Sequence, residues 1–556
     1  RCIFETNTID AAGKAMNVDD IVETANHFKC IDMVISQARY ALSERFIKGL
    51  HLTLKNGTSN ARSGWFAVGD YKRLPNEVGG RETTPPEEVA AAMSALLASC
   101  ADDESFSTSR GDVLSFSVDT LKMDTTFSNV PTPTRSFWVY NRTGKALRCQ
   151  SVRLENGNQK GYRVNVDGSY LGSEAGFQTQ NVEIRKGDSI RVFVELTSAM
   201  QNSKEPQLVS DNLVFALESG VEQKVNLRAF SWDAMKLNSL EVKQDQLLES
   251  TLPVVVYGGI RVDSAATLTI APGTQLYFHE NAGLQVFGSL KIEGEKDREV
   301  MMRGDRLDHM FDYLPYDRTP GQWQGIRLMS SAHDCRISFA DIHSAYDAVM
   351  IEAGDATKQK LLIENATIHN SQGYGVRIDS AKVQVYNSQI TNCLNHPLYV
   401  EGGDVEVNGC TIAQFYPFDG RRESAIGFAS PLPRFEVRNS LVTGYHDDEV
   451  VWEAPKEEDA FNFLFDHCVL RTEKLETDDS LKFTHVVYED IKDKTVFAEK
   501  HFRLFDTDNL KYDFHLSKES AAIGKAAAET LPATDRDGLP RKKEQPAAGC
   551  FEYREE

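Results

Sequence analysis

The sequence has few cysteines and no cysteine-rich motif. Its nine cysteines are spread over 556 residues, and no two of them form a Cys-x-x-Cys pair. This spacing argues against zinc knuckles and thioredoxin-type redox sites. The cysteines are also too sparse for a disulfide-based scaffold, so we expect most of them to be small buried apolar residues.

Long apolar runs and an excess of basic residues are missing as well. No stretch approaches the roughly 18 apolar residues that a membrane-spanning helix needs. Lys and Arg total 61 against 82 Asp and Glu, a formal net charge of −21. Such an acidic surface repels phosphate backbones, so we expect no nucleic-acid partner. The sequence has no P-loop, GxSxG or HExxH motif, and we predict no cofactor and no metal site.

Residues 1–98 have the apolar periodicity of helices. Apolar residues recur at spacings of three and four between Ile21 and Ile35, which is typical of one helix face. Ser43, preceded by Leu42 and followed by Ile47, has the pattern of an N-cap with a hydrophobic staple. A third helix is expected after Pro85–Pro86.

Part of this segment resembles the first half of a Fic domain. The matching stretches are Leu42-Ser-Glu-Arg-Phe-Ile-Lys-Gly-Leu-His51, Trp65-Phe-Ala-Val-Gly-Asp-Tyr-Lys72 and Thr84-Pro-Pro-Glu-Glu-Val-Ala90. The resemblance implies transfer of AMP from ATP to protein hydroxyls. However, the family's catalytic motif, H-P-F-x-D/E-G-N-G-R, is absent from this sequence. We therefore interpret residues 1–98 as a truncated Fic-like segment and expect no AMP transfer.

Residues 99–112 form a join to a different kind of sequence. Leu97-Ala-Ser-Cys100 resembles the lipobox of bacterial lipoproteins, and the acidic run Ala101-Asp-Asp-Glu104 resembles a signal for export to the cell surface. The resemblance implies that Cys100 carries a lipid if the protein is processed there. The sequence before it lacks the basic n-region and clean apolar core of a signal peptide. A fusion of a Fic fragment with a lipoprotein accounts for both halves.

Residues 113–238 alternate between apolar and polar residues, as half-buried strands do. Examples are Leu114–Val118, Ser136–Tyr140 and Ile190–Val194, and turn signals such as Asn156-Gly157 separate the strands. About seven short strands with such turns predict an immunoglobulin-like β-sandwich.

An internal repeat follows between residues 250 and 500. Aligned on one apolar position, it gives Ile342, Ile368, Ile390, Ile412, Val442 and Leu470. Periods near 22 residues suit one coil of a parallel β-helix, in which short strands stack about 4.8 Å apart. Mainly β structure with a right-handed parallel β-helix is therefore the predicted fold.

Two further columns accompany the apolar one. Three residues before the anchor stand Phe339, Asn365, Asn387, Gly409, Asn439 and His467, and two residues before it stand only small residues. Stacked asparagines can form amide ladders along the coils. We therefore expect Asn365, Asn387 and Asn439 to form a ladder beside the stacked Ile368, Ile390 and Ile412.

Residues 101–556 resemble the Bacteroidetes-type surface lipoproteins that carry a β-sandwich followed by a right-handed β-helix. The resemblance lies in Asp305-Arg-Leu-Asp308, Tyr313-Leu-Pro-Tyr316 and Pro320-Gly-Gln-Trp-Gln-Gly-Ile326, and residues 501–556 resemble the closing segment of these proteins. It implies a surface location but no defined activity.

The coils could carry either a catalytic site or a binding surface. Glycoside hydrolases need paired carboxylates about 5–10 Å apart. Asp447 and Glu449 could converge, since they share one strand face, but solvated acids at a coil corner explain them as well. Aromatic residues could instead form a sugar-binding strip, and the candidates are Tyr313, Tyr316, Trp323, Tyr399 and Tyr416.

We expect an exported cell-surface lipoprotein that binds a glycan or a surface protein without catalysis, attached to the membrane only through a lipid on Cys100. A polysaccharide lyase or hydrolase on the β-helix is the alternative. A Fic-type adenylyltransferase is the second alternative.

Overall fold

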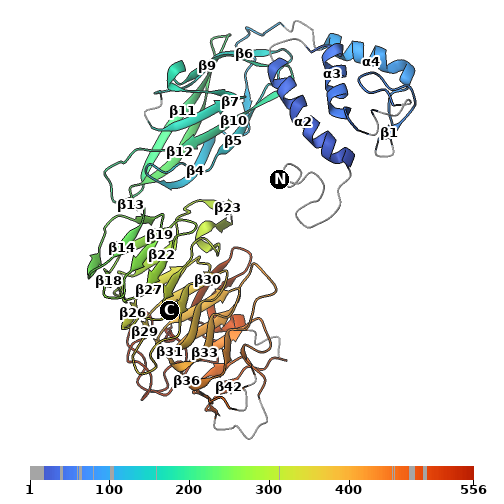
Figure 1. Cartoon of the computed structure of the whole chain (residues 1–556). Coiled ribbons are helices and arrows are strands. Elements are labelled where there is room, and N and C mark those ends of the chain that lie inside the picture. Colours follow the sequence, from blue (N-terminus) through green and yellow to red (C-terminus); the bar gives the residue numbers. More distant parts are fainter. Residues whose placement is uncertain are drawn as a thin grey trace. The chain divides into compact units, whose positions relative to one another are not determined.

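A computed structural model describes residues 18–37, 42–58, 61, 66–78, 81–99, 105–157, 160–311, 313–453, 455, 458–474, 482–492 and 498–555 (Figure 1). The secondary structure is mainly β, as predicted. The helices belong to one compact unit and the β-helix to another.

The described N-terminal segment consists of helices α2 (Val18–Gln37), α3 (Glu44–Lys55) and α4 (Pro86–Ser99) and the short hairpin β1 (Glu77–Val78) and β2 (Arg81–Glu82). Ser43 caps α3, because its hydroxyl accepts a hydrogen bond from the backbone N–H of Phe46 at 3.3 Å. None of the described helices combines the length and the apolar character that a membrane span needs.

The described strands between residues 115 and 232 form two five-stranded sheets. One sheet has the order β3 (Ser115–Phe116), β5 (Arg135–Tyr140), β10 (Ser189–Leu196), β7 (Tyr162–Val166) and β8 (Ser169–Tyr170). The other has the order β4 (Thr120–Phe127), β12 (Glu222–Trp232), β11 (Gln207–Leu217), β6 (Leu147–Leu154) and β9 (Gln178–Ile184), and η2 (Ser173–Ala175) precedes β9. Buried and exposed residues alternate along β7 and β10, as a sandwich core requires.

The chain after the two sandwich sheets forms the coils of a parallel β-helix with three sides. The first side, sheet A, has eleven described strands: β13 (Met235–Leu237), β16 (Val254–Val256), β19 (Gln275–Phe278), β22 (Val300–Gly304), β27 (Ala340–His343), β30 (Thr367–Ser371), β32 (Gln389–Cys393), β34 (Thr411–Gln414), β37 (Leu441–Gly444), β40 (Val469–Leu470) and β42 (Val487–Tyr488). The coils therefore begin at Met235, before the expected start at 250.

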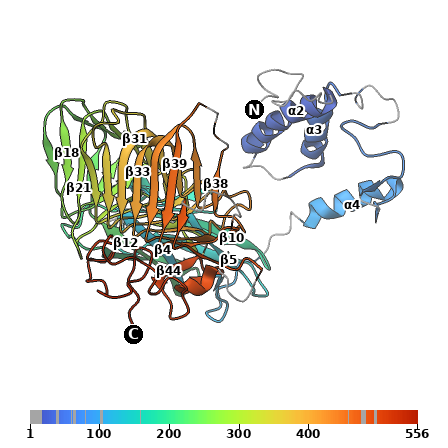
Figure 2. The ribbon, with the colours of Figure 1, turned by 90° about the horizontal axis from the view of Figure 1, so that it is seen from below.

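The other two sides belong to one long sheet, whose strands lie side by side in Figure 2. Face B1 contains β14 (Leu240–Val242), β17 (Ile260–Val262), β20 (Leu284–Val286), β25 (Ile326–Leu328), β28 (Val349–Ile351), the first parts of β31 (Val376–Tyr386) and β33 (Leu398–Asn408), β35 (Ile426–Ala429) and β38 (Val450–Trp452). Face B2 contains β15 (Gln246–Leu248), β18 (Thr267–Ile270), β21 (Ser289–Glu293), β26 (Cys335–Ser338), β29 (Leu361–Glu364), the second parts of β31 and β33, β36 (Leu432–Arg438), β39 (Phe461–Asp466) and β41 (Phe483–Thr484).

The coil interior is a stack of aliphatic side chains. Ile368, Ile390 and Ile412 pair in register on β30, β32 and β34, and all three are fully buried. The period of the repeat explains this arrangement, because each coil must return one apolar side chain to the same inward position.

The corner between face B2 and sheet A is a tight turn whose first residue has a positive φ. Asn365 (φ 52°), Asn387 (φ 45°) and Asn439 (φ 51°) stand at this place in their coils, as do Phe339, Gly409, His467 and His485. Asparagine tolerates the left-handed region better than most residues, and this preference accounts for the column. Backbone conformation therefore selects the asparagines at this corner.

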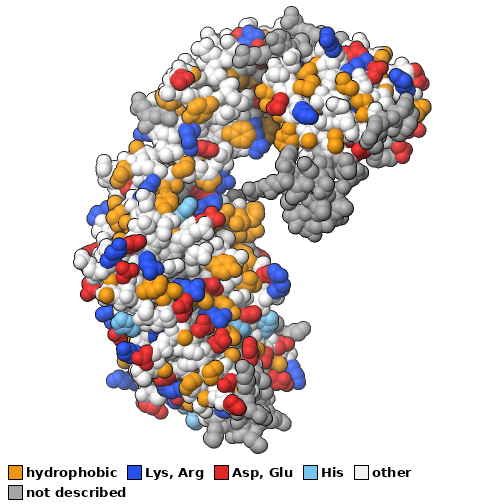
Figure 3. All heavy atoms as spheres, in the orientation of Figure 1, with side chains coloured by type: hydrophobic (Ala, Val, Ile, Leu, Met, Phe, Trp, Pro, Cys, Tyr) orange, Lys and Arg blue, Asp and Glu red, His pale blue; other side chains and the backbone are white. Residues whose placement is uncertain are grey.

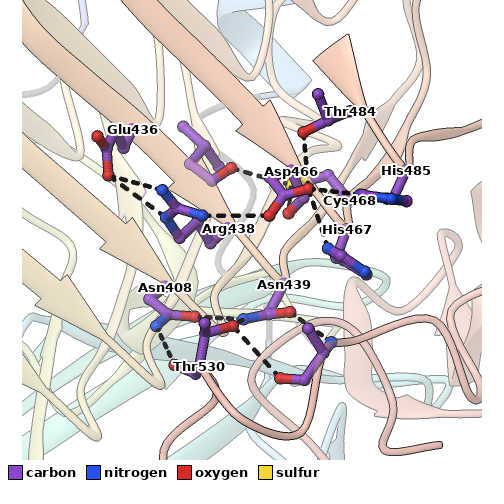
Figure 4. A network of polar contacts seen from close by, with 12 residues as sticks. Asn408, Glu436, Arg438, Asn439, Asp466, His467, Cys468, Thr484, His485 and Thr530 are labelled. Carbon is purple, nitrogen blue, oxygen red and sulfur yellow. Dashed lines mark hydrogen bonds and ion pairs between the residues drawn. The ribbon is translucent and has the colours of Figure 1, made fainter. Parts of the chain in front are cut away.

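The expected amide ladder is not formed. Within the part of the chain that the structure describes, no hydrogen bond joins the side chains of Asn365 and Asn387. Instead, Asn387 Nδ2 donates to the carbonyl of Thr534 at 2.8 Å. Asn439 Nδ2 donates to Asn408 Oδ1 at 2.9 Å (Figure 4). Asn387 thus bonds to the C-terminal segment, and Asn439 bonds to the end of β33 on the preceding coil.

The C-terminal segment contains η4 (Ala498–His501), β43 (Phe502–Asp506) and β44 (Lys511–Leu516) and continues without further strands to residue 555. It covers the outer face of the late strands of sheet A. Phe415, Leu441 and Val469 pack there against Phe502 and Phe514 in one buried cluster. The segment thus closes this side of the β-helix.

Candidate functional site

The five predicted aromatic contacts do not form one strip. Trp323 is fully buried and stacks on Phe278 at 4.3 Å, and Tyr416 is buried as well. These two side chains point into the protein, so the prediction that they bind a glycan is wrong. Tyr313 is exposed and Tyr316 is half-buried; Tyr313 lies on the excursion formed by β23 (His309–Phe311) and β24 (Leu314–Pro315), and Tyr316 begins η3 (Tyr316–Arg318). Tyr399 lies elsewhere, on face B1.

The acidic residues near 447 are not a hydrolase pair. Glu449 is fully buried and accepts hydrogen bonds from the backbone N–H groups of Ala425 and His446, both at 2.7 Å. Burial outweighs these bonds and raises the pKa of Glu449 to about 8. Asp447 is exposed and pairs with Arg471 at 3.2 Å. The two carboxylates therefore do not face a common open groove.

The predicted lipidation site lies outside the described residues. This applies to Cys100 and to the acidic run at 101–104.

A column of outward side chains runs along face B1. Because the strands pair in parallel register, one outward residue from each coil lies beside the next: Glu241, Arg261, Gln285, Arg327, Met350, Arg377 and Tyr399. The inward neighbours in these strands, such as Ile326 and Val349, are fully buried. Alternation along each short strand therefore presents a mostly polar strip to solvent, which Met350 interrupts.

A groove accompanies the first part of this column. It has a volume of about 440 Å³ and is lined by side chains that include Glu241, Asn281, Gln285, Gln324, Arg327 and Asp347. We call it the B1 groove. Its floor contains glycines, and a Cβ on Gly325 would stand 1.7 Å from the carbonyl oxygen of Asp347. Because position 325 cannot accommodate a side chain, the B1 groove stays open between the polar groups that line it.

The B1 groove leads to a cluster of aromatic rings. Asp347 Oδ1 accepts a hydrogen bond from the backbone N–H of Tyr374 at 2.8 Å. The ring of Tyr374 lies 5.6 Å from that of Tyr399, which stacks on His396 at 5.4 Å. The guanidinium of Arg377 lies 5.2 Å from both tyrosine rings. Tyr346, directly before Asp347, is 49% exposed.

The charges around the groove are mostly paired. Arg327 bonds Glu352 at 2.9 Å, and Arg377 bonds Asp379 at 3.0 Å and Glu401 at 2.9 Å. Figure 3 likewise shows side chains of both signs interspersed on the visible coil surface. Burial raises the pKa of Asp347, although the hydrogen bond from the backbone N–H of Tyr374 acts to lower it. The groove thus offers many hydrogen-bonding groups without a strong excess of one charge.

Sequence reasoning found only one residue of this site, Tyr399. Tyr346 and Tyr374 were missed because they lie in corners of variable length, where the repeat does not predict the direction of a side chain. Gly283 and Gly325 could have indicated the groove in the sequence. Each of them directly precedes an inward residue, Leu284 or Ile326.

Comparison with known proteins supports the fold. A family model described as a right-handed β-helix region matches residues 324–426. These residues run from just before β25 to the start of β35, and the match confirms the predicted handedness of the coils. No curated protein sequence matches the chain.

Three solved structures are similar to this chain at low scores. A family 123 glycoside hydrolase from Clostridium perfringens has 8% identity and a TM-score of 0.16, covering 24% of this chain and 30% of that one. A GH87 α-1,3-glucanase from Streptomyces thermodiastaticus has 11% identity and a TM-score of 0.20, covering 64% and 90%. Dex49A from Penicillium minioluteum has 8% identity and a TM-score of 0.16, covering 65% and 82%. At such values these matches carry no conclusion about activity.

Proposed function

We propose that this chain is an exported cell-surface protein that binds a linear glycan along face B1 without cleaving it. The observation that carries the proposal is the B1 groove, with hydrogen-bonding side chains along its length and aromatic rings at one end.

The regular spacing of the coils favours a polymer as ligand. Successive coils repeat about every 4.8 Å, so the polar strip presents a new side chain at each step. Glu241, Gln285 and Arg327 supply both donors and acceptors. A chain of sugar units, which carries hydroxyl groups at regular intervals, can bond to several coils at once.

The aromatic cluster supplies the apolar part of such a site. Tyr399 in this cluster, and Tyr346 directly before the groove residue Asp347, each combine an apolar ring with a hydroxyl group, the combination common in ligand sites. We propose binding without cleavage because Glu449 is buried. The acidic pair that the sequence suggested, Asp447 and Glu449, therefore does not present two carboxylates to a bound glycan.

The surface location and the lipid anchor on Cys100 remain part of this proposal. They rest on the lipobox-like Leu97–Cys100 and the acidic residues after it. A groove that faces outward on a long coil stack suits a protein displayed on a cell.

Binding can be tested with immobilised and soluble glycans. We expect the purified protein to retain one class of linear polysaccharide in affinity electrophoresis and to release no reducing ends from it. Tyr346→Ala and Tyr399→Ala should each weaken retention at least severalfold. Tyr170→Ala is a matched control, since Tyr170 is 56% exposed on β8, far from the groove in sequence.

Three results would contradict the proposal. They are no retention by any glycan, equal retention by wild type and both groove variants, and release of oligosaccharides. Thermal melts should show that the variants stay folded, because Tyr346 is an exposed side chain and Tyr399 a half-buried one.

A further inference from the structure

The outer face of sheet A changes character along the coils. On the early coils, Val255 and Tyr277 belong to an apolar cluster with Phe127. On the late coils, Leu441 and Val469 pack under the C-terminal segment. Between these apolar zones, β27 and β30 present Asp341, His343, Thr367 and His369 on the same outer face. These polar side chains therefore stand out on a face that is apolar on either side of them.

Asp341, His343 and His369 bring three ligand-type atoms together. Asp341 Oδ1 lies 2.8 Å from His343 Nδ1 and 3.2 Å from His369 Nε2, and the three atoms lie within 4.8 Å of one another. His343 and His369 occupy equivalent positions on paired strands, with ring centroids 4.7 Å apart. Two strands of a stacked sheet hold these groups, so their geometry does not depend on a loop.

A carboxylate outside this cluster fixes one of the rings. Asp317 Oδ1 lies 3.1 Å from His343 Nε2, the nitrogen that faces away from Asp341. Arg303 bonds the same carboxylate. A carboxylate on the far nitrogen of a histidine sets the orientation of the ring and raises its basicity, as it does for histidines that bind metals.

We propose that Asp341, His343 and His369 bind a divalent transition-metal ion such as Zn²⁺. Two imidazole nitrogens and one carboxylate oxygen are suitable ligands for this class of ion. His369 also lines a cavity of about 330 Å³, together with Thr367, Thr391, Asp513 and His515. The cavity leaves room for a water molecule or a ligand as a further metal ligand.

A second Asp–His–His group provides a contrast. Asp466 Oδ1 lies 3.0 Å from both His467 Nδ1 and His485 Nδ1 (Figure 4). However, the same oxygen also accepts from Thr484 Oγ1 at 2.7 Å, and Asp466 Oδ2 accepts from Arg438 at 3.1 Å. This carboxylate is already occupied, and His485 is largely exposed. We therefore assign the metal to the cluster on sheet A alone.

The test uses the whole chain after treatment with a chelator. Titration with Zn²⁺ should show one ion bound per chain, and Co²⁺ should give visible d–d absorption. Asp317→Asn should weaken Zn²⁺ binding by roughly 10- to 100-fold, the usual effect of losing a carboxylate behind a histidine ligand. His369→Gln should weaken it at least as much, and His485→Gln, from the second group, should leave it unchanged.

Two results would overturn the proposal. One is the absence of a stoichiometric ion and of the cobalt bands, which would mean that the histidines are only ion-pair partners of Asp341. The other is loss of binding in His485→Gln with binding kept in His369→Gln. His369 is partly exposed, so His369→Gln should fold, and Asp317→Asn keeps both proposed histidine ligands in place.

Discussion

The guanidinium of Arg541 donates to Asn387 Oδ1 at 3.0 Å, across 154 residues of sequence. Asn387 holds the left-handed turn at the corner of its coil. Arg541 also donates to the carbonyl of Gly549 at 2.9 Å, so one buried cation joins two parts of the C-terminal segment to the coil corner. Two asparagines of this column, Asn387 and Asn439, thus bond to that segment.

Replacing two asparagines of this column should separate the contribution of the left-handed backbone to stability from that of the side-chain hydrogen bonds. Asn365→Ala places an alanine at a positive φ, and we expect a loss of about 1–2 kcal/mol in the free energy of unfolding. Asn439→Ala also removes bonds to Asn408, Thr530 and the N–H of Ala527, so it should lose about 3 kcal/mol or more.

Glycine variants at both positions serve as controls, because glycine adopts a positive φ without strain. Asn365→Gly should be close to wild type in urea unfolding, whereas Asn439→Gly should keep the loss due to its hydrogen bonds. Equal losses in the two alanine variants would contradict this view of the corner.

The aliphatic column can be tested with a buried charge. Ile390→Asp should destabilise the protein by about 4 kcal/mol or more, because an unpaired carboxylate would lie between Ile368 and Ile412. Leu247→Asp is the control, since Leu247 is 58% exposed on β15 and its change should stay within about 1 kcal/mol. A melting temperature of Ile390→Asp equal to that of wild type would show that position 390 does not face the interior.

His515 predicts a pH dependence of the stability of the C-terminal segment. Burial lowers its pKa, but Asp513 and Asp537 outweigh that effect and raise the pKa to about 9. The stabilisation from the protonated ring is therefore complete below pH 6.5, the ordinary value, and is lost as the pH rises through about 9.

With a side chain one-third exposed, we expect an effect of about 1–2 kcal/mol after allowance for solvent screening. Unfolding of wild type at pH 6.5 and 9.5 should show this loss, and His515→Gln should show less of it. His333→Gln, at an exposed histidine, is the control. Equal pH dependence in wild type and His515→Gln would rule out this role for His515.

Lipidation is tested at Cys100. Expressed in a bacterium from its complete natural gene, the protein should incorporate a clickable fatty acid, and Cys100→Ala should remove the label. Cys30→Ala, in α2, should keep it. Labelling of Cys100→Ala at the wild-type level would contradict the proposed anchor.

The sequence predicted the coils well because their interior is periodic. Every coil returns an aliphatic residue to the same inward position, so Ile368, Ile390 and Ile412 could be aligned without a structure. The first coils were harder to predict, since strands of three residues, such as β13, are too short for a clear alternation.

Site residues were predicted less well, because the type of a residue does not tell whether its side chain points into the core or toward solvent. Trp323 and Tyr399 are both aromatic, yet one points into the core and the other lies half-buried on face B1. The histidine pair, by contrast, had a signal: His343 and His369 directly follow the aligned Ile342 and Ile368. Residues next to an inward anchor must point outward, so the same alignment predicts that the two rings lie together.

The corner between face B2 and sheet A, with its residue of positive φ, keeps nearly the same length from coil to coil. From Phe339 onward this corner spans only a residue or two, whereas chain is added at the other two corners, as in the excursion before β25. An inserted loop at either of those corners should leave the pairing of the coils unchanged. New recognition segments can therefore be added to this protein there, whereas the same insertion at the short corner would disrupt a turn of one or two residues.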